Sequence, residues 1–91
     1  MAVFAVVVRA SGSTPRAVGA KMLVRSDGTT VGTVGGGAFE AMVTQDALDL
    51  LASSAPAPAV RRYTFTEHGE DALGMACGGT AEVLLDPSGA G

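Results

Sequence analysis

The chain opens on a run of apolar, mostly β-branched residues. Residues 2–10 are apolar at almost every position, without the alternation of a strand that faces water on one side. This pattern predicts a strand that is buried on both faces. A second strand is predicted over residues 20–24, and Asp27-Gly28 separates it from a β-rich run over residues 30–34. Asp-Gly between two such runs predicts a β-hairpin.

A helical period follows the hairpin. Apolar residues recur at the spacing of one helical face at Phe39, Val43, Ala47, Leu50 and Leu51, which predicts a helix over residues 37–52. Pro56 and Pro58 prevent its continuation, and strands are predicted over residues 59–66 and 80–85. The order of elements predicts an α+β fold, with a small mixed β-sheet of about five strands covered by one main helix.

Length and composition set the expected class of protein. The chain has 91 residues, of which 47% are hydrophobic and 4% aromatic, so we expect one domain with a small core of Val, Leu, Ala and Met. The domain is expected over residues 3–86, with residues 87–91 as a tail or linker stub. Because so small a core leaves apolar surface, a homodimer is expected, with the strand over residues 2–10 or the Phe39 face of the helix in the interface.

Charge and hydropathy exclude some partners. The net charge of −3 lacks the basic footprint that nucleic acids require. The longest apolar run is far shorter than the roughly 20 residues that span a bilayer, and no basic segment follows Met1. We therefore expect a cytoplasmic protein that binds neither nucleic acid nor membrane.

Glycine and small polar residues gather in three predicted loops. Gly35, Gly36 and Gly37 lie between a strand and a helix, where backbone amides suit a phosphate, although a tight turn would also use glycine. Glu40 lies in the first helical turn, as a capping or a functional carboxylate. The first loop offers hydroxyls and a guanidinium that suit an oxyanion, although a solvated loop explains them too; these residues are Ser11, Ser13, Thr14 and Arg16.

The third loop holds Cys77, the only cysteine, which rules out an internal disulfide and a multi-cysteine zinc site. It is flanked by small residues and followed by Gly78 and Gly79, a setting that favours a reactive or metal-ligating thiol over a core thiol. His68 lies nine residues earlier and is interpreted as a surface residue rather than a base. The chain has no Asn to complete a Cys-His hydrolase site, and no other catalytic set is apparent.

Four ordered motifs together resemble one family. They are Ser-Gly-Ser-Thr-Pro-Arg over residues 11–16, Gly-Ala-Lys-Met over 19–22, Gly-Thr-Val-Gly-Gly-Gly-Ala-Phe-Glu over 32–40 and Ala-Cys-Gly-Gly over 76–79. Over residues 3–86 the chain resembles the amino-terminal domain of the XdhC/CoxI family. Its members are accessory proteins of molybdenum hydroxylases such as xanthine dehydrogenase and carbon monoxide dehydrogenase. They bind the molybdopterin cofactor and help its sulfuration and insertion.

The resemblance implies that this chain is a cofactor-binding chaperone module without turnover of its own. Implied partners are a molybdenum hydroxylase apoenzyme and a cysteine desulfurase, and Cys77 is the implied metal ligand. The implied cofactor-binding residues are Ser11, Ser13, Thr14, Arg16, Gly35, Gly36, Gly37, Glu40, Cys77, Gly78 and Gly79. A thiol enzyme or sulfur carrier that uses Cys77, or a structural domain without ligand, are the alternative hypotheses.

The chain departs from its relatives in two ways. Ala38 stands where many relatives have a second cysteine, which argues against two-thiol chemistry. Typical members continue into a Rossmann-like domain, whereas this chain ends at Gly91. We therefore expect a fragment, a stand-alone module or half of a split pair.

Overall fold

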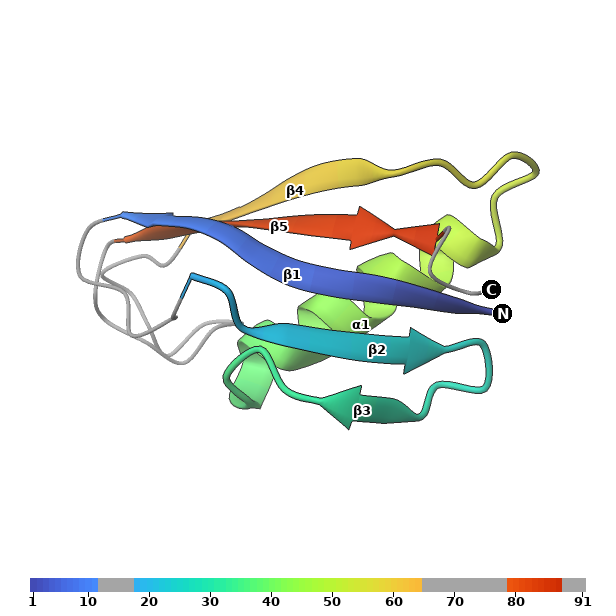
Figure 1. The fold of residues 1–91 in the computed structure, drawn as a ribbon, viewed down its shortest axis with the longest axis horizontal. Coiled ribbons are helices and arrows are strands. Elements are labelled where there is room, and N and C mark those ends of the chain that lie inside the picture. Colours follow the sequence, from blue (N-terminus) through green and yellow to red (C-terminus); the bar gives the residue numbers. More distant parts are fainter. Residues whose placement is uncertain (12–17, 65–78, 88–91) are drawn as a thin grey trace.

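A computed structural model describes residues 1–11, 18–64 and 79–87 of the chain (Figure 1). Its elements are β1 (Ala2–Ser11), β2 (Lys21–Arg25), β3 (Thr30–Gly32), α1 (Gly37–Leu51), β4 (Ala59–Thr64) and β5 (Thr80–Asp86). The predicted α+β class, with five strands and one helix, is confirmed.

The five strands form one sheet in the order β3-β2-β1-β5-β4. All four pairings are antiparallel, so the prediction of a mixed sheet is wrong. The order in which the chain places its strands explains why no pair is parallel. β1, β3 and β4 run in one direction and alternate with β2 and β5, so no two strands of like direction are neighbours (Figure 1). α1 carries the chain from the edge strand β3 to the edge strand β4 at the opposite side.

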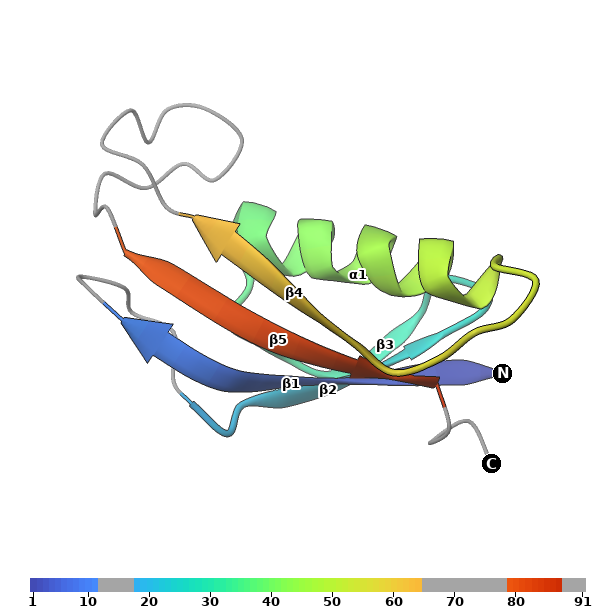
Figure 2. The same cartoon turned by 90° about the horizontal axis from the view of Figure 1, so that it is seen from above.

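Helix and sheet form two layers, with α1 on one face of the sheet (Figure 2). Alternate strand residues point toward the helix and are buried, and they include Val3, Ala5, Val7, Met22, Val24, Val83 and Leu85. From α1, Phe39, Val43 and Ala47 complete this core. Phe39 is fully buried, so the prediction that its face of the helix forms a dimer interface is wrong.

The other face of the sheet is open. Phe4 on β1 is 41% exposed and Val6 is half-buried, so the prediction that this strand is buried on both faces is wrong. The physical reason is that one helix can cover only one face, and nothing else in the described part of the chain lies on the other (Figure 2).

The Asp27-Gly28 hairpin between β2 and β3 is confirmed. The Asp27 carboxylate accepts hydrogen bonds from the Thr29 backbone N–H at 3.0 Å and the Thr29 hydroxyl at 2.6 Å. These bonds to the charged form lower the pKa of Asp27. Gly28 has a φ of 89°, a conformation that glycine adopts without strain.

β3 ends two residues earlier than predicted, at Gly32. Gly32 has a φ of 84°, which departs from strand geometry, and a Cβ atom there would lie 2.8 Å from the Lys21 carbonyl oxygen. The chain therefore leaves the sheet here and turns toward α1.

Candidate functional site

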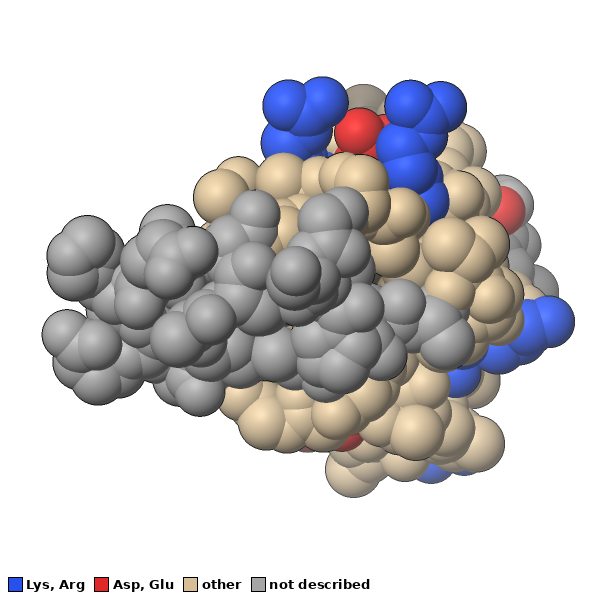
Figure 3. Space-filling model, turned by 90° about the vertical axis from the view of Figure 1, so that its left-hand side faces the viewer, with Lys and Arg blue, Asp and Glu red and all other residues tan. Residues whose placement is uncertain are grey.

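Two of the three candidate loops attach at one end of the sheet. Ser11, the last residue of β1, is the register partner of Thr80, the first residue of β5, and their hydroxyl oxygens lie 2.6 Å apart. On the other side of β5, Thr80 is the register partner of Thr64, the last residue of β4. The strand ends that flank residues 12–17 and 65–78 therefore lie side by side, at the end of the molecule shown in Figure 3.

The first turn of α1 packs beside the same end of β4. The rings of Phe39 and Tyr63 are 5.4 Å apart between centroids and nearly perpendicular, at 87°. The Tyr63 hydroxyl also donates a hydrogen bond, at 2.5 Å, to the carboxylate of Asp46, which follows Phe39 later in α1. Burial and the neighbouring Asp46 carboxylate raise the pKa of Tyr63, so its hydroxyl remains a donor. These contacts hold α1 against the strand that leads into residue 65.

The triple glycine forms the turn that leads into α1. Gly35, Gly36 and Gly37 have φ values of 130°, 76° and 65°, all in the range that residues with a Cβ rarely adopt. The path of the backbone therefore requires glycine at all three positions. This geometry accounts for the motif as a tight turn, one of the two interpretations of the sequence.

The Glu40 side chain, in the first turn of α1, folds back and forms hydrogen bonds with this turn. Its Oε1 atom accepts hydrogen bonds from the Val34 backbone N–H at 3.2 Å, from the Gly36 backbone N–H at 3.0 Å and from the Thr33 hydroxyl. The Thr33 hydroxyl oxygen in turn accepts a bond from the Gly35 N–H at 3.0 Å. A carboxylate of the protein thus lies where an anion would bind at this helix start.

Glu40 occupies two of the backbone amides beside the triple glycine, where a phosphate was expected. The amides of Val34 and Gly36 already have an acceptor, and a phosphate beside them would face the like charge of Glu40. Sequence reasoning identified Glu40 but missed Thr33. A hydroxyl residue two positions before Gly35 was the available signal, since such side chains bond to nearby backbone amides.

The remaining candidate residues fall into two groups. Ser11 and the triple glycine are described, and Gly79, just before β5, is buried. Five others lie outside the described residues: Ser13, Thr14, Arg16, Cys77 and Gly78. Within residues 1–11, 18–64 and 79–87, no group of three or more His, Cys, Asp and Glu side chains could hold a metal ion.

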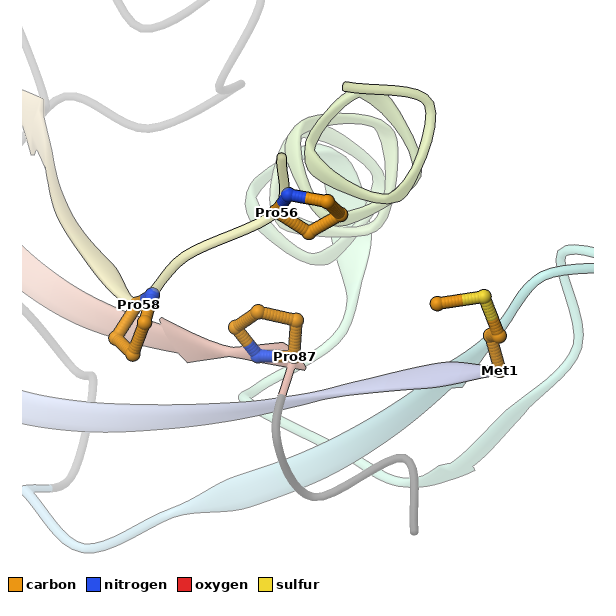
Figure 4. Close-up of a pocket in the computed structure, with 4 residues that line it drawn as sticks. All are labelled: Met1, Pro56, Pro58 and Pro87. Atoms are coloured by element: carbon orange, nitrogen blue, oxygen red, sulfur yellow. The ribbon is translucent and has the colours of Figure 1, made fainter. Parts of the chain in front are cut away.

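A pocket lies at the opposite end of the sheet, beside Met1 and Pro87 (Figure 4). Its lining consists of Met1, Pro56, Pro58 and Pro87, whose side chains carry neither a charge nor a hydroxyl group. The side chains of its lining therefore offer no acid, base or nucleophile. In the part of the chain that the structure describes, no helix is long and apolar enough to cross a membrane.

Comparison with known proteins gave consistent matches. The model of the XdhC and CoxI family matches residues 1–64. The uncharacterized protein YqeB of Escherichia coli (strain K12) is 41% identical over 83 residues, which is 91% of this chain and 15% of that protein. Among solved structures, a xanthine dehydrogenase (BH1974) from Bacillus halodurans is similar with a TM-score of 0.76 and 33% identity, over 94% of this chain and 26% of that chain. The chain thus spans about a quarter or less of these relatives.

Proposed function

Because the chain belongs to the XdhC and CoxI family, we propose that it binds the molybdenum cofactor and assists maturation of a molybdenum hydroxylase. Membership of this family suggests an accessory role for molybdenum enzymes, and the similar protein from Bacillus halodurans is described as a xanthine dehydrogenase. The proposed client is an apoenzyme of the xanthine dehydrogenase or carbon monoxide dehydrogenase type. A cysteine desulfurase is the proposed source of sulfur, and the cytoplasm is the proposed location.

One observation carries this proposal: the strand ends that flank residues 12–17 and 65–78 lie at the same end of the fold as the start of α1. Ser11 pairs with Thr80 across β1 and β5, and Phe39 in the first turn of α1 contacts Tyr63 near the end of β4. A ligand at this end would lie beside the start of the helix and beside the strand ends that lead into the segments containing Arg16 and Cys77. Scattered attachment points would have favoured a purely structural role for the glycines.

The cofactor's chemistry suits some of these residues better than others. A molybdopterin carries a phosphate, a polar ring system and a metal held by sulfur. The Cys77 thiolate is the soft ligand for the metal, and the Arg16 guanidinium with the Ser13 and Thr14 hydroxyls suits the phosphate. We assign the phosphate to these residues rather than to the triple glycine, because Glu40 already accepts bonds from the amides of that turn. Glu40 keeps a supporting role by holding the turn.

Replacing Cys77 by serine tests the assignment. A hydroxyl cannot replace a deprotonated sulfur on a soft metal, so Cys77→Ser is expected to lose most of the molybdenum and pterin that the parent protein retains. Both would be quantified after purification from cells that make the cofactor, at equal protein concentration.

Ser54→Ala, in the exposed connector after α1, is the matched control and is expected to retain cofactor like the parent. Retention of parental pterin by Cys77→Ser would remove Cys77 from the site. Absence of pterin from the parent protein itself, after purification from the same cells, would contradict the proposed function.

A further inference from the structure

A β-bulge changes the pairing between β1 and β5. Val7 is the register partner of Val83. Two positions later, Arg9 is the partner of Glu82, which directly precedes Val83. Val8 is therefore an extra residue on β1, and the bulge turns the side chains that follow it, Arg9 first, to the other face of the sheet. Because Val8 is apolar and 43% exposed, the bulge does not serve to bury its own side chain.

The bulge also places Ser11 opposite Thr80. Without it, the register of residues 4–7 would set Ser11 against Gly79, which has no side chain. With it, Ser11 is the register partner of Thr80, and their hydroxyl oxygens lie 2.6 Å apart. Both side chains lie on the open face, since Ala81, the next residue of β5 after Thr80, is buried toward the helix. The hydrogen-bonded hydroxyl pair therefore depends on the bulge.

The hydroxyl pair joins the strand ends that lead into two candidate segments. Ser11 directly precedes residues 12–17, which hold the side chains that we assign to the phosphate. Thr80 follows Cys77 after two glycines, the residue type that restricts the backbone least. Thr80 is therefore the first residue after Cys77 whose side chain can fix the position at which that segment meets the sheet.

We propose that Thr80 and Ser11 are positioning residues of the cofactor site, an inference that rests on the proposed function. Backbone bonds of a sheet stop at the strand ends, which open more easily than the centre of the sheet. The bond between the two hydroxyls acts at that point and fixes the separation of the ends of β1 and β5. Ser11 then acts through Thr80, and not by the direct contact with the cofactor that the family resemblance implied.

Thr64 offers a comparison within the same row of the sheet. It is the register partner of Thr80 on the other side of β5, and it ends β4 as Ser11 ends β1. Its side chain lies on the open face and, among the residues that the structure describes, its hydroxyl has no hydrogen bond. Two threonines thus share residue type and row, but only the Thr80 hydroxyl is bonded to a neighbouring strand.

The rate at which the purified protein releases pterin after dilution tests this role. Thr80→Val keeps a β-branched side chain of similar shape but removes the hydroxyl. It is expected to release pterin about three- to tenfold faster than the parent, the effect of one lost hydrogen bond. Thr80→Ser restores a hydroxyl and should release pterin at close to the parental rate. Thr64→Val is the matched control, with the same substitution one strand away, and should behave like the parent.

A double-mutant cycle separates positioning by Ser11 from direct binding. If Ser11 acts only through Thr80, Ser11→Ala should accelerate pterin release as much as Thr80→Val does, and the double variant no more than either. A Ser11 that binds the cofactor directly would add its own effect to that of Thr80→Val. Urea denaturation of each variant is expected to give a midpoint close to that of the parent, because the bond is exposed and lies at the end of the sheet.

Three results would overturn the positioning role while leaving the proposed function in place. The first is a folded Thr80→Val variant that releases pterin at the parental rate. The second is a Thr64→Val variant that releases pterin as fast as Thr80→Val, which would indicate a general loosening of the strand ends. The third is a cycle in which the effects of Ser11→Ala and Thr80→Val add. A parent protein that holds no pterin would contradict the proposed function, and this role with it.

Discussion

Gly32 shows how one backbone position limits substitution. A side chain there meets two obstacles, a φ of 84° and a contact of 2.8 Å between its Cβ and the Lys21 carbonyl oxygen. Gly32→Ala is expected to lower the free energy of unfolding by about 2–3 kcal/mol, which urea denaturation would measure. Gly28→Ala is the control, since Gly28 has a φ of 89° but no atom within 4 Å of such a Cβ, and about 1 kcal/mol is expected. Equal losses would show that the Lys21 contact relaxes.

Glu40 separates a structural from a ligand-binding interpretation of the triple-glycine turn. Glu40→Gln keeps an acceptor oxygen but removes its charge, so the bonds from Val34 and Gly36 weaken and the free energy of unfolding should fall by about 1 kcal/mol. Pterin retention is expected to change less than about twofold, because we assign the phosphate to Arg16. Gln45→Ala, on the exposed side of the helix, is a control, because the Gln45 side chain bonds to Asp49 and not to the turn. A clear rise in retention by Glu40→Gln would place the phosphate at the turn instead.

The contact between α1 and β4 depends on Tyr63. Tyr63→Phe keeps the ring against Phe39 but removes the hydrogen bond to the half-buried Asp46 carboxylate. The free energy of unfolding is expected to fall by about 1–2 kcal/mol, which corresponds to a decrease in Tm of several degrees for a domain of this size. Calorimetry at neutral pH measures this. An unchanged Tm would mean that water replaces the tyrosine hydroxyl at Asp46 without loss.

The buried Tyr63 hydroxyl should also make the free energy of unfolding fall at alkaline pH. The folded state raises the pKa of Tyr63 above its ordinary value of about 10, because burial and Asp46 disfavour the phenolate. Above about pH 10 the unfolded chain releases this proton while the folded chain keeps it, so the free energy of unfolding falls as the pH rises. Tyr63→Phe should reduce this slope, as urea denaturation between pH 8 and about 11 would show. If the free energy of unfolding fell equally steeply with pH in the parent and in Tyr63→Phe, the pH dependence would not come from Tyr63.

At the scale of the whole molecule, the homodimer expected from the sequence would link stability to concentration. A partner that binds only the folded state raises Tm by mass action, so the Tm of the parent should rise with protein concentration. Phe4→Lys places a charge on the open face of the sheet and should show a Tm independent of concentration. Met42→Lys, at a similarly exposed position on the helix, should behave like the parent. A parent whose Tm is constant over a hundredfold range would agree with a single folded chain and contradict the dimer.

The elements with local causes could be predicted from the sequence. The hairpin at Asp27-Gly28 depends on a turn within a few residues, and the helix over Gly37–Leu51 depends on an apolar period and on the prolines that follow it. Both signals lie within one stretch of chain, so no distant contact is needed to recognise them. The five strands and one helix followed from such local patterns.

Only the tertiary structure decided how these elements meet. Ser11 and Thr80 lie 69 positions apart in the sequence and are paired in the sheet, and Tyr63 reaches Asp46 from another element. Whether β1 is covered on one face or two depends on where α1 crosses the sheet, and the apolar run over residues 2–10 is compatible with both. The role of Glu40 likewise depended on where its carboxylate folds back. The sequence alone determined the elements because their causes are local, whereas strand order, the open face and the bonds of the turn arise from contacts between distant parts of the chain.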